Sequence, residues 1–457
     1  MRILLSGTKK FKEFLKNFSR RGEAGFEQVD SQVRKILKEV KTLGDSALFA
    51  LTEKFDRWKA SAQTIQVNSR EMKSAFQNLS PEERRTLAFT ASRIERFHFL
   101  QIQHSWKFAE EDGTILGQMV RPLKKVGIYV PGGKAAYPSS VLMNAIPARV
   151  AGAAEIIMVC PAPQGNLDVR VLAAAHLAGV TALFKIGGAQ AIAALAYGTQ
   201  TIPKVDKIVG PGNIYVASAK RMVFGEVSID SIAGPSEILI IADGSSQPVF
   251  LAADLLSQAE HDERASAVLL CTSKRVAKGV LEEIQKQLSV LPRKEIAAES
   301  LKKFGAILLV RSLTEAAQIS NILAPEHLEL AVADPLRLLG KIENAGAIFL
   351  GHLSPEAIGD YVAGPNHVLP TGGTARFSSP LGVYDFLKRS SLICLSPEGL
   401  KKLAPSGMRL AQMENLEGHR RSIEKRQGAL GFSFSLLGES SKNRSLAPPF
   451  LGRATNG

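Results

Sequence analysis

A glutamine and a histidine lie three positions apart in the sequence Gln258-Ala259-Glu260-His261. Residues at this spacing lie on the same face of a helix, so the two side chains could form half of a metal site. Histidine is a common zinc ligand, whereas glutamine is an unusual one. The alternative is a capping or core histidine at the end of a helix, and this motif alone favours that alternative.

A glutamate and a histidine are adjacent in the sequence Ala324-Pro325-Glu326-His327. Their side chains have different pKa values in solution, so together they could carry protons in general acid–base catalysis. Neighbours on a strand point to opposite faces, but the preceding proline favours a bend that would let both reach one cleft. A partly exposed loop explains the pair equally well, and the pair alone leaves both interpretations open.

Other polar residues lie in segments rich in glycine and proline or in charge. Asp360 falls in an extended glycine- and proline-rich loop, which in a compact enzyme is usually functional or mobile. His367 belongs to the same loop, where it could order its surroundings. Glu414 and His419 are five positions apart in a charged helical stretch, so they do not share a helix face unless Gly418 interrupts the helix. Considered alone, both are surface residues.

Three glycine-containing turns each follow a strand pattern and precede a helical one. They are Pro131-Gly132-Gly133, Gly187-Gly188-Ala189-Gln190 and Gly210-Pro211-Gly212-Asn213. Free backbone amides at such helix starts bind phosphate, and the side chains of Gln190 and Asn213 could add hydrogen bonds. The usual dinucleotide fingerprint G-x-G-x-x-G is missing from the sequence, and ordinary strand–helix turns are the alternative. The presence of three such turns in one sheet favours a nucleotide site.

These turns belong to a pattern in which short buried strands alternate with helices. Strands are predicted at residues 126–130, 155–160, 182–186, 207–209, 237–242, 267–271, 306–310 and 346–350. The alternation indicates parallel sheets covered on both faces, in two α/β units that meet near residues 231–236. Because such sheets bind ligands at the carboxyl ends of their strands, the site is expected at that edge. The first part of the chain looks helical, and Ser80-Pro81-Glu82-Glu83 has the pattern of a helix start.

The 457 residues carry a formal net charge of +14, which is compatible with nucleic acid, a membrane surface or an anionic small ligand. Aromatic residues make up 6% of the chain, and no segment interleaves them with basic residues as a stacking platform for nucleic acid would. No apolar segment is long enough to cross a membrane, and no secretory signal is visible. The three scattered cysteines do not form a disulfide or zinc framework. We therefore expect a cytoplasmic protein that binds neither nucleic acid nor membranes.

Taken in order, the motifs resemble the histidinol dehydrogenase family from the first helices to about residue 428. The segments that carry the resemblance are GIYVPGG from Gly127, IGGAQAIAALA from Ile186, DSIAGPSE from Asp230, LLSQAEH from Leu255, APEH from Ala324 and GPNHVLPT from Gly364. The resemblance implies an NAD-dependent, zinc-containing enzyme that oxidises L-histidinol to L-histidine through L-histidinal, the last steps of histidine biosynthesis. It also implies an α/β fold of two Rossmann-like parallel-sheet domains with helical N- and C-terminal extensions, related to aldehyde dehydrogenases and assembled as a domain-swapped homodimer.

The resemblance also assigns roles to matching positions in this sequence. The acid–base pair looks like Glu326 and His327, and the NAD contacts look like Tyr129, Gln190 and Asn213. The ligands of one zinc ion per subunit look like Gln258, His261, Asp360 and His419. The substrate contacts look like Ser236, Gln258, His261, His327, Asp360, Glu414 and His419. In the family's homodimer, Glu414 and His419 would serve the active site of the other subunit.

The resemblance further predicts how the chain is divided. Residues 1–24 are expected to form a helical extension, residues 108–236 the NAD-binding domain, and residues 381–428 the dimerisation helices. Residues 25–107 are expected to join residues 237–380 in the metal- and substrate-binding domain, and residues 429–457 to form a disordered tail. Two alternative functions stay open: an NAD-dependent dehydrogenase of another polar alcohol, such as a sulfonated diol, and a basic nucleic-acid-binding protein.

Overall fold

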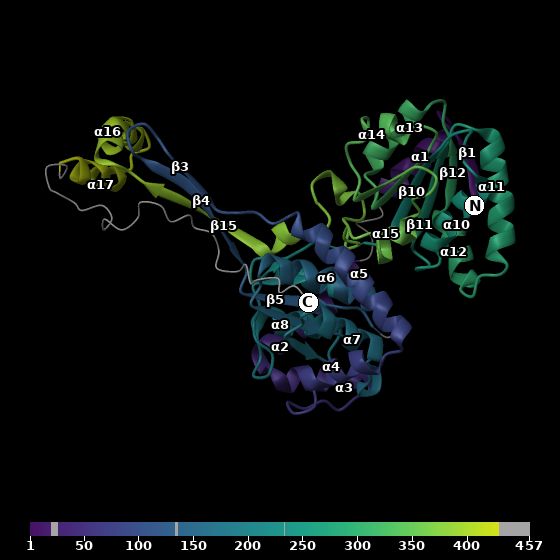
Figure 1. Cartoon of the computed structure of the whole chain (residues 1–457), viewed down its shortest axis with the longest axis horizontal. Coiled ribbons are helices and arrows are strands. Elements are labelled where there is room, and N and C mark those ends of the chain that lie inside the picture. The colour runs from purple at the N-terminus through teal and green to yellow at the C-terminus, as the bar shows by residue number, and fades with distance from the viewer. Residues whose placement is uncertain (20–25, 133–135, 233, 429–457) are drawn as a thin grey trace, which may run out of the picture. The chain divides into compact units, whose positions relative to one another are not determined.

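The computed structural model describes residues 1–19, 26–132, 136–232 and 234–428, so the predicted tail at 429–457 lies outside the described residues. The chain divides into two compact units, which are coloured by residue number in Figure 1. The first unit contains residues 1–102 and 122–386, and the second contains residues 103–121 and the chain from residue 387 onward. Within the described part of the chain, none of the helices has the length and apolar character needed to span a bilayer.

One sheet of the first unit, the β10 sheet, has six strands that all pair in parallel. Their order across the sheet is β1 (Arg2–Leu5), β12 (Ala306–Leu309), β11 (Ser266–Cys271), β10 (Glu237–Ala242), β13 (His327–Ala331) and β14 (Ala347–Leu350). Its two hydrophobic cores lie on opposite faces, one under α10 (Pro248–Ala259), α11 (Lys274–Leu288) and α12 (Lys294–Phe304), the other under α1 (Lys9–Ser19), α13 (Leu313–Leu323) and α14 (Pro335–Leu339). A short helix, α15 (Glu356–Tyr361), follows β14.

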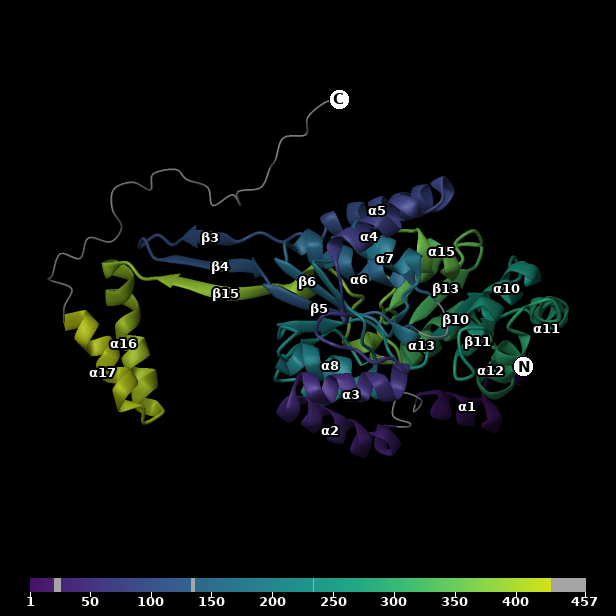
Figure 2. The same ribbon diagram turned by 90° about the horizontal axis from the view of Figure 1, so that it is seen from below.

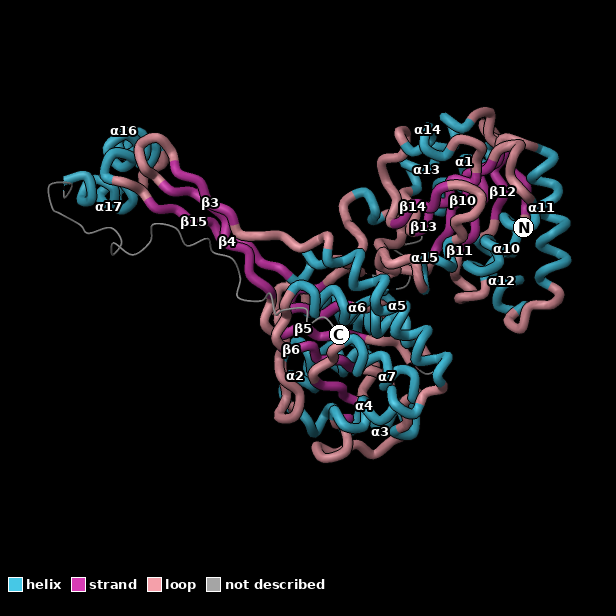
Figure 3. The backbone as a smooth tube through the Cα atoms, viewed as in Figure 1, coloured by secondary structure: helices cyan, strands magenta, loops and turns pink. Residues whose placement is uncertain are grey.

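The other sheet of the first unit, the β5 sheet, is parallel except for its edge strand β2, which pairs antiparallel with β7. The strand order is β2 (Gln66–Val67), β7 (Ala182–Phe184), β6 (Glu155–Val159), β5 (Lys125–Tyr129), β8 (Lys207–Val209) and β9 (Ser228–Ile229). One core lies under α2 (Phe26–Leu43), α3 (Asp45–Asp56), α8 (Gly188–Tyr197) and α9 (Ile214–Val223). The other lies under α4 (Ser69–Asn78), α5 (Pro81–Phe99), α6 (Pro138–Ala151) and α7 (Val169–Ala178). Figure 2 shows α2 and α3 beside α8, and Figure 3 distinguishes strands from covering helices.

The early helices cover a different sheet from the one predicted. Helix α2 packs on α8 and α9, α4 packs on α7, and α5 packs on α6, so residues 26–99 belong with the β5 sheet. The prediction that they join residues 237–380 is therefore wrong. Helical periodicity shows that a helix has a buried face, but it does not show which partner covers that face.

The N-terminal segment also differs from its prediction. Residues 2–5 form the edge strand of the β10 sheet before helix α1 begins, so residues 1–24 do not start as a helical extension. A strand of four residues is too short to show a reliable alternation of apolar and polar side chains.

The predicted strands of both sheets are present, and the predicted α/β class is confirmed. Strand β13 was not predicted, because the buried Glu329 interrupts its apolar run. The predicted helix start at Ser80 is also confirmed. The Ser80 hydroxyl accepts from the Glu83 amide at 3.1 Å, and the Glu83 carboxylate accepts from the Ser80 amide at 3.1 Å.

The second unit combines a three-stranded sheet with two helices. The strands lie in the order β15 (Leu387–Cys394), β4 (Ile115–Pro122) and β3 (Trp106–Ala109), and the helices α16 (Pro397–Met413) and α17 (Glu417–Gly428) pack on each other. Residues 108–121 therefore lie apart from the β5 sheet, so the predicted start of an NAD-binding domain at residue 108 is wrong. Part of the segment 381–428, predicted as helices, is a strand. The break between the helices comes at Asn415, with φ +55°, and not at Gly418. Short 3₁₀ turns complete the described elements: η2 (Pro163–Gly165), η3 (Thr374–Arg376) and η4 (Val383–Phe386).

Candidate active site

A cavity of about 1080 Å³ in the first unit is lined by segments that flank both sheets. The β5 sheet contributes the turn 210–213, which follows the carboxyl end of β8. The β10 sheet contributes Ser236 and the pair Glu326-His327, which lie at the amino ends of β10 and β13. The expected carboxyl-end position is therefore correct for the β5 sheet and wrong for the β10 sheet, where the polar residues precede their strands.

The backbone of one residue, Glu237, forms hydrogen bonds with both side chains of the predicted acid–base pair. Its amide donates to the Glu326 carboxylate at 2.9 Å, and its carbonyl accepts from Nδ1 of His327 at 3.1 Å. Both side chains are buried, so the alternative of a partly exposed loop is wrong. The parallel pairing of β10 and β13, which sets Ile238 opposite His327, fixes this arrangement.

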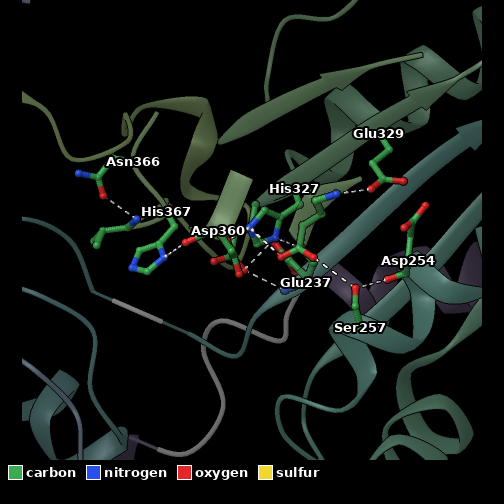
Figure 4. Close-up of polar contacts among 11 residues, drawn as sticks. Glu237, Asp254, Ser257, His327, Glu329, Asp360, Asn366 and His367 are labelled. Atoms are coloured by element: carbon green, nitrogen blue, oxygen red, sulfur yellow. Dashed lines mark hydrogen bonds and ion pairs between the residues drawn. The ribbon is translucent and has the colours of Figure 1, made fainter. Parts of the chain in front are cut away.

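In its neutral form, the His327 ring is held in one tautomer. Because a carbonyl oxygen can only accept, Nδ1 carries the proton and Nε2 is the basic nitrogen. Nε2 lies 3.7 Å from a carboxylate oxygen of Glu356 and 3.7 Å from one of Asp360, and it has no hydrogen-bond partner among the described residues. Figure 4 shows His327 beside Asp360, with His367 on the other side of Asp360.

The charges around His327 perturb its titration strongly. Burial lowers the pKa of His327, but the carboxylates of Glu326, Asp360 and Glu356 outweigh burial and raise this pKa to about 10. Burial raises the pKa of Glu356 to about 8. Burial also acts to raise the pKa of Asp360, yet the positive charge of the neighbouring His327 dominates and lowers it to about 2. These pKa shifts favour a protonated His327 ring beside an ionised Asp360 carboxylate.

Several side chains around the cavity have the chemistry of metal ligands. Oε1 of Gln258, Oε1 of Glu356 and Nε2 of His327 are buried without a hydrogen-bond partner among the described residues. Such an atom costs about 1–3 kcal/mol when it is left unsatisfied, so a ligand that satisfies all three is favoured. Nitrogen and oxygen donors of these types bind zinc. The residues present therefore fit a divalent cation.

The structure places a further carboxylate, that of Glu356, beside the predicted ligand Asp360. In the described chain, the histidine and acidic side chains that converge most tightly are His327, Glu356 and Asp360, whose ligand atoms lie within 4.8 Å of one another. Gln258 and His261 line the same cavity, just before and just after the end of α10. Sequence reasoning missed Glu356, although it lies four positions before Asp360, a spacing that places both on one helix face. The surrounding glycine and proline made the segment look like a loop.

The remaining predicted metal and substrate residues are distributed between the units. Ser236 lines the cavity and hydrogen-bonds Glu326. Glu414 and His419 lie in the second unit, where both are exposed. Their predicted roles at the site of a partner subunit stay predictions.

The predicted NAD contacts lie at the carboxyl edge of the β5 sheet. Asn213 lines the cavity and caps α9, accepting from the amides of Tyr215 at 3.0 Å and Val216 at 3.2 Å. Tyr129 ends β5, and its hydroxyl accepts from the Gly188 amide at 3.1 Å. Gln190 is buried in the first turn of α8. Neither Tyr129 nor Gln190 is among the residues that line the cavity, so their NAD contacts stay predictions.

The turn that carries Asn213 is held by a buried ion pair. The Gly210 amide donates to Asp230 at 2.8 Å, its carbonyl accepts from Lys220 at 2.9 Å, and Lys220 pairs with Asp230. Gly210 has φ +109°, and a Cβ there would lie 2.1 Å from the backbone oxygen of Tyr129. Only glycine fits this position, so the backbone forms the cavity wall here.

Known proteins match this chain over most of its length. The family model described as histidinol dehydrogenase matches residues 19–427. The chain is 55% identical over 426 residues to histidinol dehydrogenase from Syntrophotalea carbinolica, covering 93% of this chain and 99% of that protein. It is 55% identical over 407 residues to the histidinol dehydrogenase from Geobacter sulfurreducens, covering 89% and 95%.

A solved structure agrees with these relatives. The crystal structure of histidinol dehydrogenase from Elizabethkingia anophelis has a TM-score of 0.89 and 36% identity, covering 94% of this chain and 99% of that chain. The resemblance predicted from the ordered motifs is confirmed, and this chain belongs to the histidinol dehydrogenase family.

Proposed function

We propose that this chain oxidises L-histidinol to L-histidine through L-histidinal, with two molecules of NAD, in the last steps of histidine biosynthesis. The observation that carries the proposal is the cavity in which Glu237 holds the acid–base pair beside donors suited to a metal. The 55% identity to two histidinol dehydrogenases supports the choice of substrate. The cytoplasmic location stays a prediction.

The acid–base pair divides the proton transfers between its members. His327 would accept the hydroxyl proton through Nε2 as bound NAD oxidises the alcohol, and would then release that proton to solvent. The bond from Nδ1 to Glu237 keeps the ring in place. Glu326 would take a proton from the water that adds to the aldehyde, and His327 would accept the hydroxyl proton of the resulting hydrate in the second oxidation. Tyr129, Gln190 and Asn213 would hold NAD at the carboxyl edge of the β5 sheet.

The proposed metal is one zinc ion per subunit, held by Gln258, His261, Asp360 and His419 of the partner subunit. When bound, zinc supplies a positive charge that orients the imidazole and amine nitrogens of histidinol and offsets the carboxylate charge around His327. The unpaired Oε1 of Gln258 supports this assignment. Ser236, His327 and the partner's Glu414 complete the substrate contacts.

Complementation between inactive subunits tests the shared active site of the proposed homodimer. His261→Asn and His419→Asn proteins are each expected to be inactive, because each lacks one metal ligand. After the two are mixed and allowed to exchange subunits, one of the two sites in a heterodimer has all its ligands, so activity should return. A mixture that forms heterodimers and stays inactive would show that the sites are not shared.

The yield of NADH tests the reaction itself. With limiting L-histidinol and excess NAD, we expect two NADH per histidinol and L-histidine as the product. A sulfonated diol serves as the comparison substrate, and we expect little turnover with it. One NADH per histidinol, or faster turnover of the diol, would contradict the proposal.

A further inference from the structure

The segment 361–366, here called the strap, leads from the β10 sheet to the β5 sheet and has a cavity residue at each end. Asp360, before the strap, lies in the six-residue helix α15 that follows β14. His367 directly follows the strap and also lines the cavity. The next residue, Val368, packs in the core under α4–α7 of the β5 sheet. The strap therefore sets how Asp360 is presented to the cavity.

Hydrogen bonds within this segment tie the strap to Asp360. The amides of Val362 and Ala363 donate to the carbonyl of Ile358 at 3.0 and 2.9 Å, which closes the end of α15. Nδ1 of His367 donates to the backbone carbonyl of Asp360 at 2.9 Å. A shift of the strap would therefore move the backbone that carries the Asp360 carboxylate.

Arg93, on helix α5, holds the strap from outside the site. Its Nε donates to the carbonyl of Val362 at 2.9 Å, and its Nη2 donates to the carbonyl of Ala363 at 2.8 Å. The planar guanidinium thus fixes two successive carbonyls at once, with bonds that are charge-assisted. Arg93 is exposed and is not among the residues that line the cavity.

The backbone of the strap lies directly against α5. Gly364 has φ +116°, and a Cβ there would lie 2.9 Å from the carbonyl oxygen of Arg93. Beyond it, the buried Asn366 donates to the carbonyl of Met143 on α6 at 2.6 Å. The strap is thus attached to two helices that cover the β5 sheet, while the residue before it, Asp360, lies on α15, which follows a strand of the β10 sheet.

We infer that Arg93 is a positioning residue for the metal, because its two bonds to the strap keep Asp360 in the arrangement that binds the cation. This inference rests on the proposed function, in which Asp360 is a zinc ligand. Arg93 is not among the residues that line the cavity, so its effect passes through the strap. The inference also means that helix α5, which covers the β5 sheet, contributes to the zinc affinity of ligands on the other side of the cavity, next to the β10 sheet.

The zinc affinity of the full-length protein tests this inference. We would measure the zinc dissociation constant by competition with a chromophoric chelator for the wild type, Arg93→Met, Arg93→Lys and Arg96→Met. Arg96 is a matched control, because it is also exposed on α5 but the hydrogen bonds to the strap come from Arg93. Loss of two charged hydrogen bonds at a partly solvated site should weaken zinc binding by about tenfold in Arg93→Met. Arg93→Lys should be intermediate, since lysine lacks the planar fork.

The outcomes separate this inference from the proposed function. A wild type that binds no zinc would refute the metal assignment itself. A wild type that binds zinc tightly, with Arg93→Met equally tight, would refute only the role of Arg93. Equal weakening in Arg93→Met and Arg96→Met would point to lost surface charge and would also refute it. NAD affinity, measured on the same proteins, should stay unchanged, and a parallel loss would indicate general loosening of the fold, against the inference.

Discussion

The two sides of the cavity are built by different means. On the side of the β5 sheet, the wall is a glycine turn whose backbone is fixed by a buried ion pair. The backbone of this turn, rather than charged side chains, defines the shape of the cavity there. On the side of the β10 sheet, the wall contains the buried Glu326 and His327 at the amino end of β13 and the half-buried Asp360 on α15. The first arrangement suits a large ligand that needs close backbone contact, and the second suits proton transfer and a cation.

This difference predicts that substitutions on the two sides impair different properties of the enzyme. Changes on the β10 side should lower the rate of the chemical steps or the metal affinity. Changes on the β5 side should weaken NAD binding while the chemistry of bound complexes is preserved.

The largest effect is expected for His327→Asn on the β10 side. Asparagine can still donate to the Glu237 carbonyl, but it cannot accept the substrate proton, so kcat should fall by about 10²–10⁴ with a modest change in KM. Steady-state kinetics with histidinol would measure this. His352→Asn is the control, since that histidine hydrogen-bonds Ser245 and does not line the cavity. Turnover near wild type in His327→Asn would remove His327 from the mechanism.

A smaller and more selective effect is expected for Glu326→Gln. Because Glu326 activates the water that adds to the aldehyde, oxidation of histidinal should slow by about 10²-fold, more than oxidation of histidinol. Single-turnover measurements started separately from the alcohol and from the aldehyde would resolve the two steps on one protein. Equal losses in both steps would contradict the assignment.

On the β5 side, Gly210→Ala should raise the KM for NAD by about tenfold, with little change in kcat at saturating NAD. The added Cβ would meet the backbone oxygen of Tyr129 and displace the turn that carries Asn213. Gly225→Ala is a matched control, because Gly225 also has a positive φ, +103°, but has nothing within 4 Å of the added carbon. If both variants raise the KM equally, backbone strain and not the cavity wall would be responsible.

The smallest effect is expected in the pH dependence of stability of the metal-free protein. The pKa of His327 is raised to about 10, above its ordinary value, so the protonated ring stabilises the fold below about pH 6.5 and this contribution is lost as pH rises through about 10. Glu356, whose pKa is raised to about 8, acts in the same direction, because its buried charged form is disfavoured. Urea unfolding should therefore show stability falling over this range, and less so with zinc bound. Stability that rises with pH would contradict the charge arrangement.

The sequence predicted most of the fold because buried parallel strands and their helices leave strong local patterns. The eight predicted strands of the two sheets and the capping box at Ser80 follow from such patterns. The partner of a helix is not local information, which is why residues 26–99 were placed on the wrong sheet. Strand β1 was too short to be recognised, and the buried Glu329 concealed β13.

The candidate site was predicted only in part, because local motifs are visible in the sequence but contacts between distant segments are not. The motifs located Glu326, His327, Gln258 and Asp360. From the residues alone, however, the Glu326-His327 pair left a structural explanation open, and the motif that contains Gln258 favoured one. Only the fold shows that Glu237 holds Glu326 and His327 from a neighbouring strand. Arg93 gave no local signal, because its contact with the strap joins residues separated by 269 positions.

The metal dependence of histidinol oxidation tests the central claim most directly. Protein stripped with a chelator should contain no zinc and produce no NADH from histidinol, and addition of one zinc per subunit should restore two NADH per histidinol. Turnover at the wild-type rate by demonstrably zinc-free protein would contradict the claim that a cation on the β10 side of the cavity holds the substrate for His327.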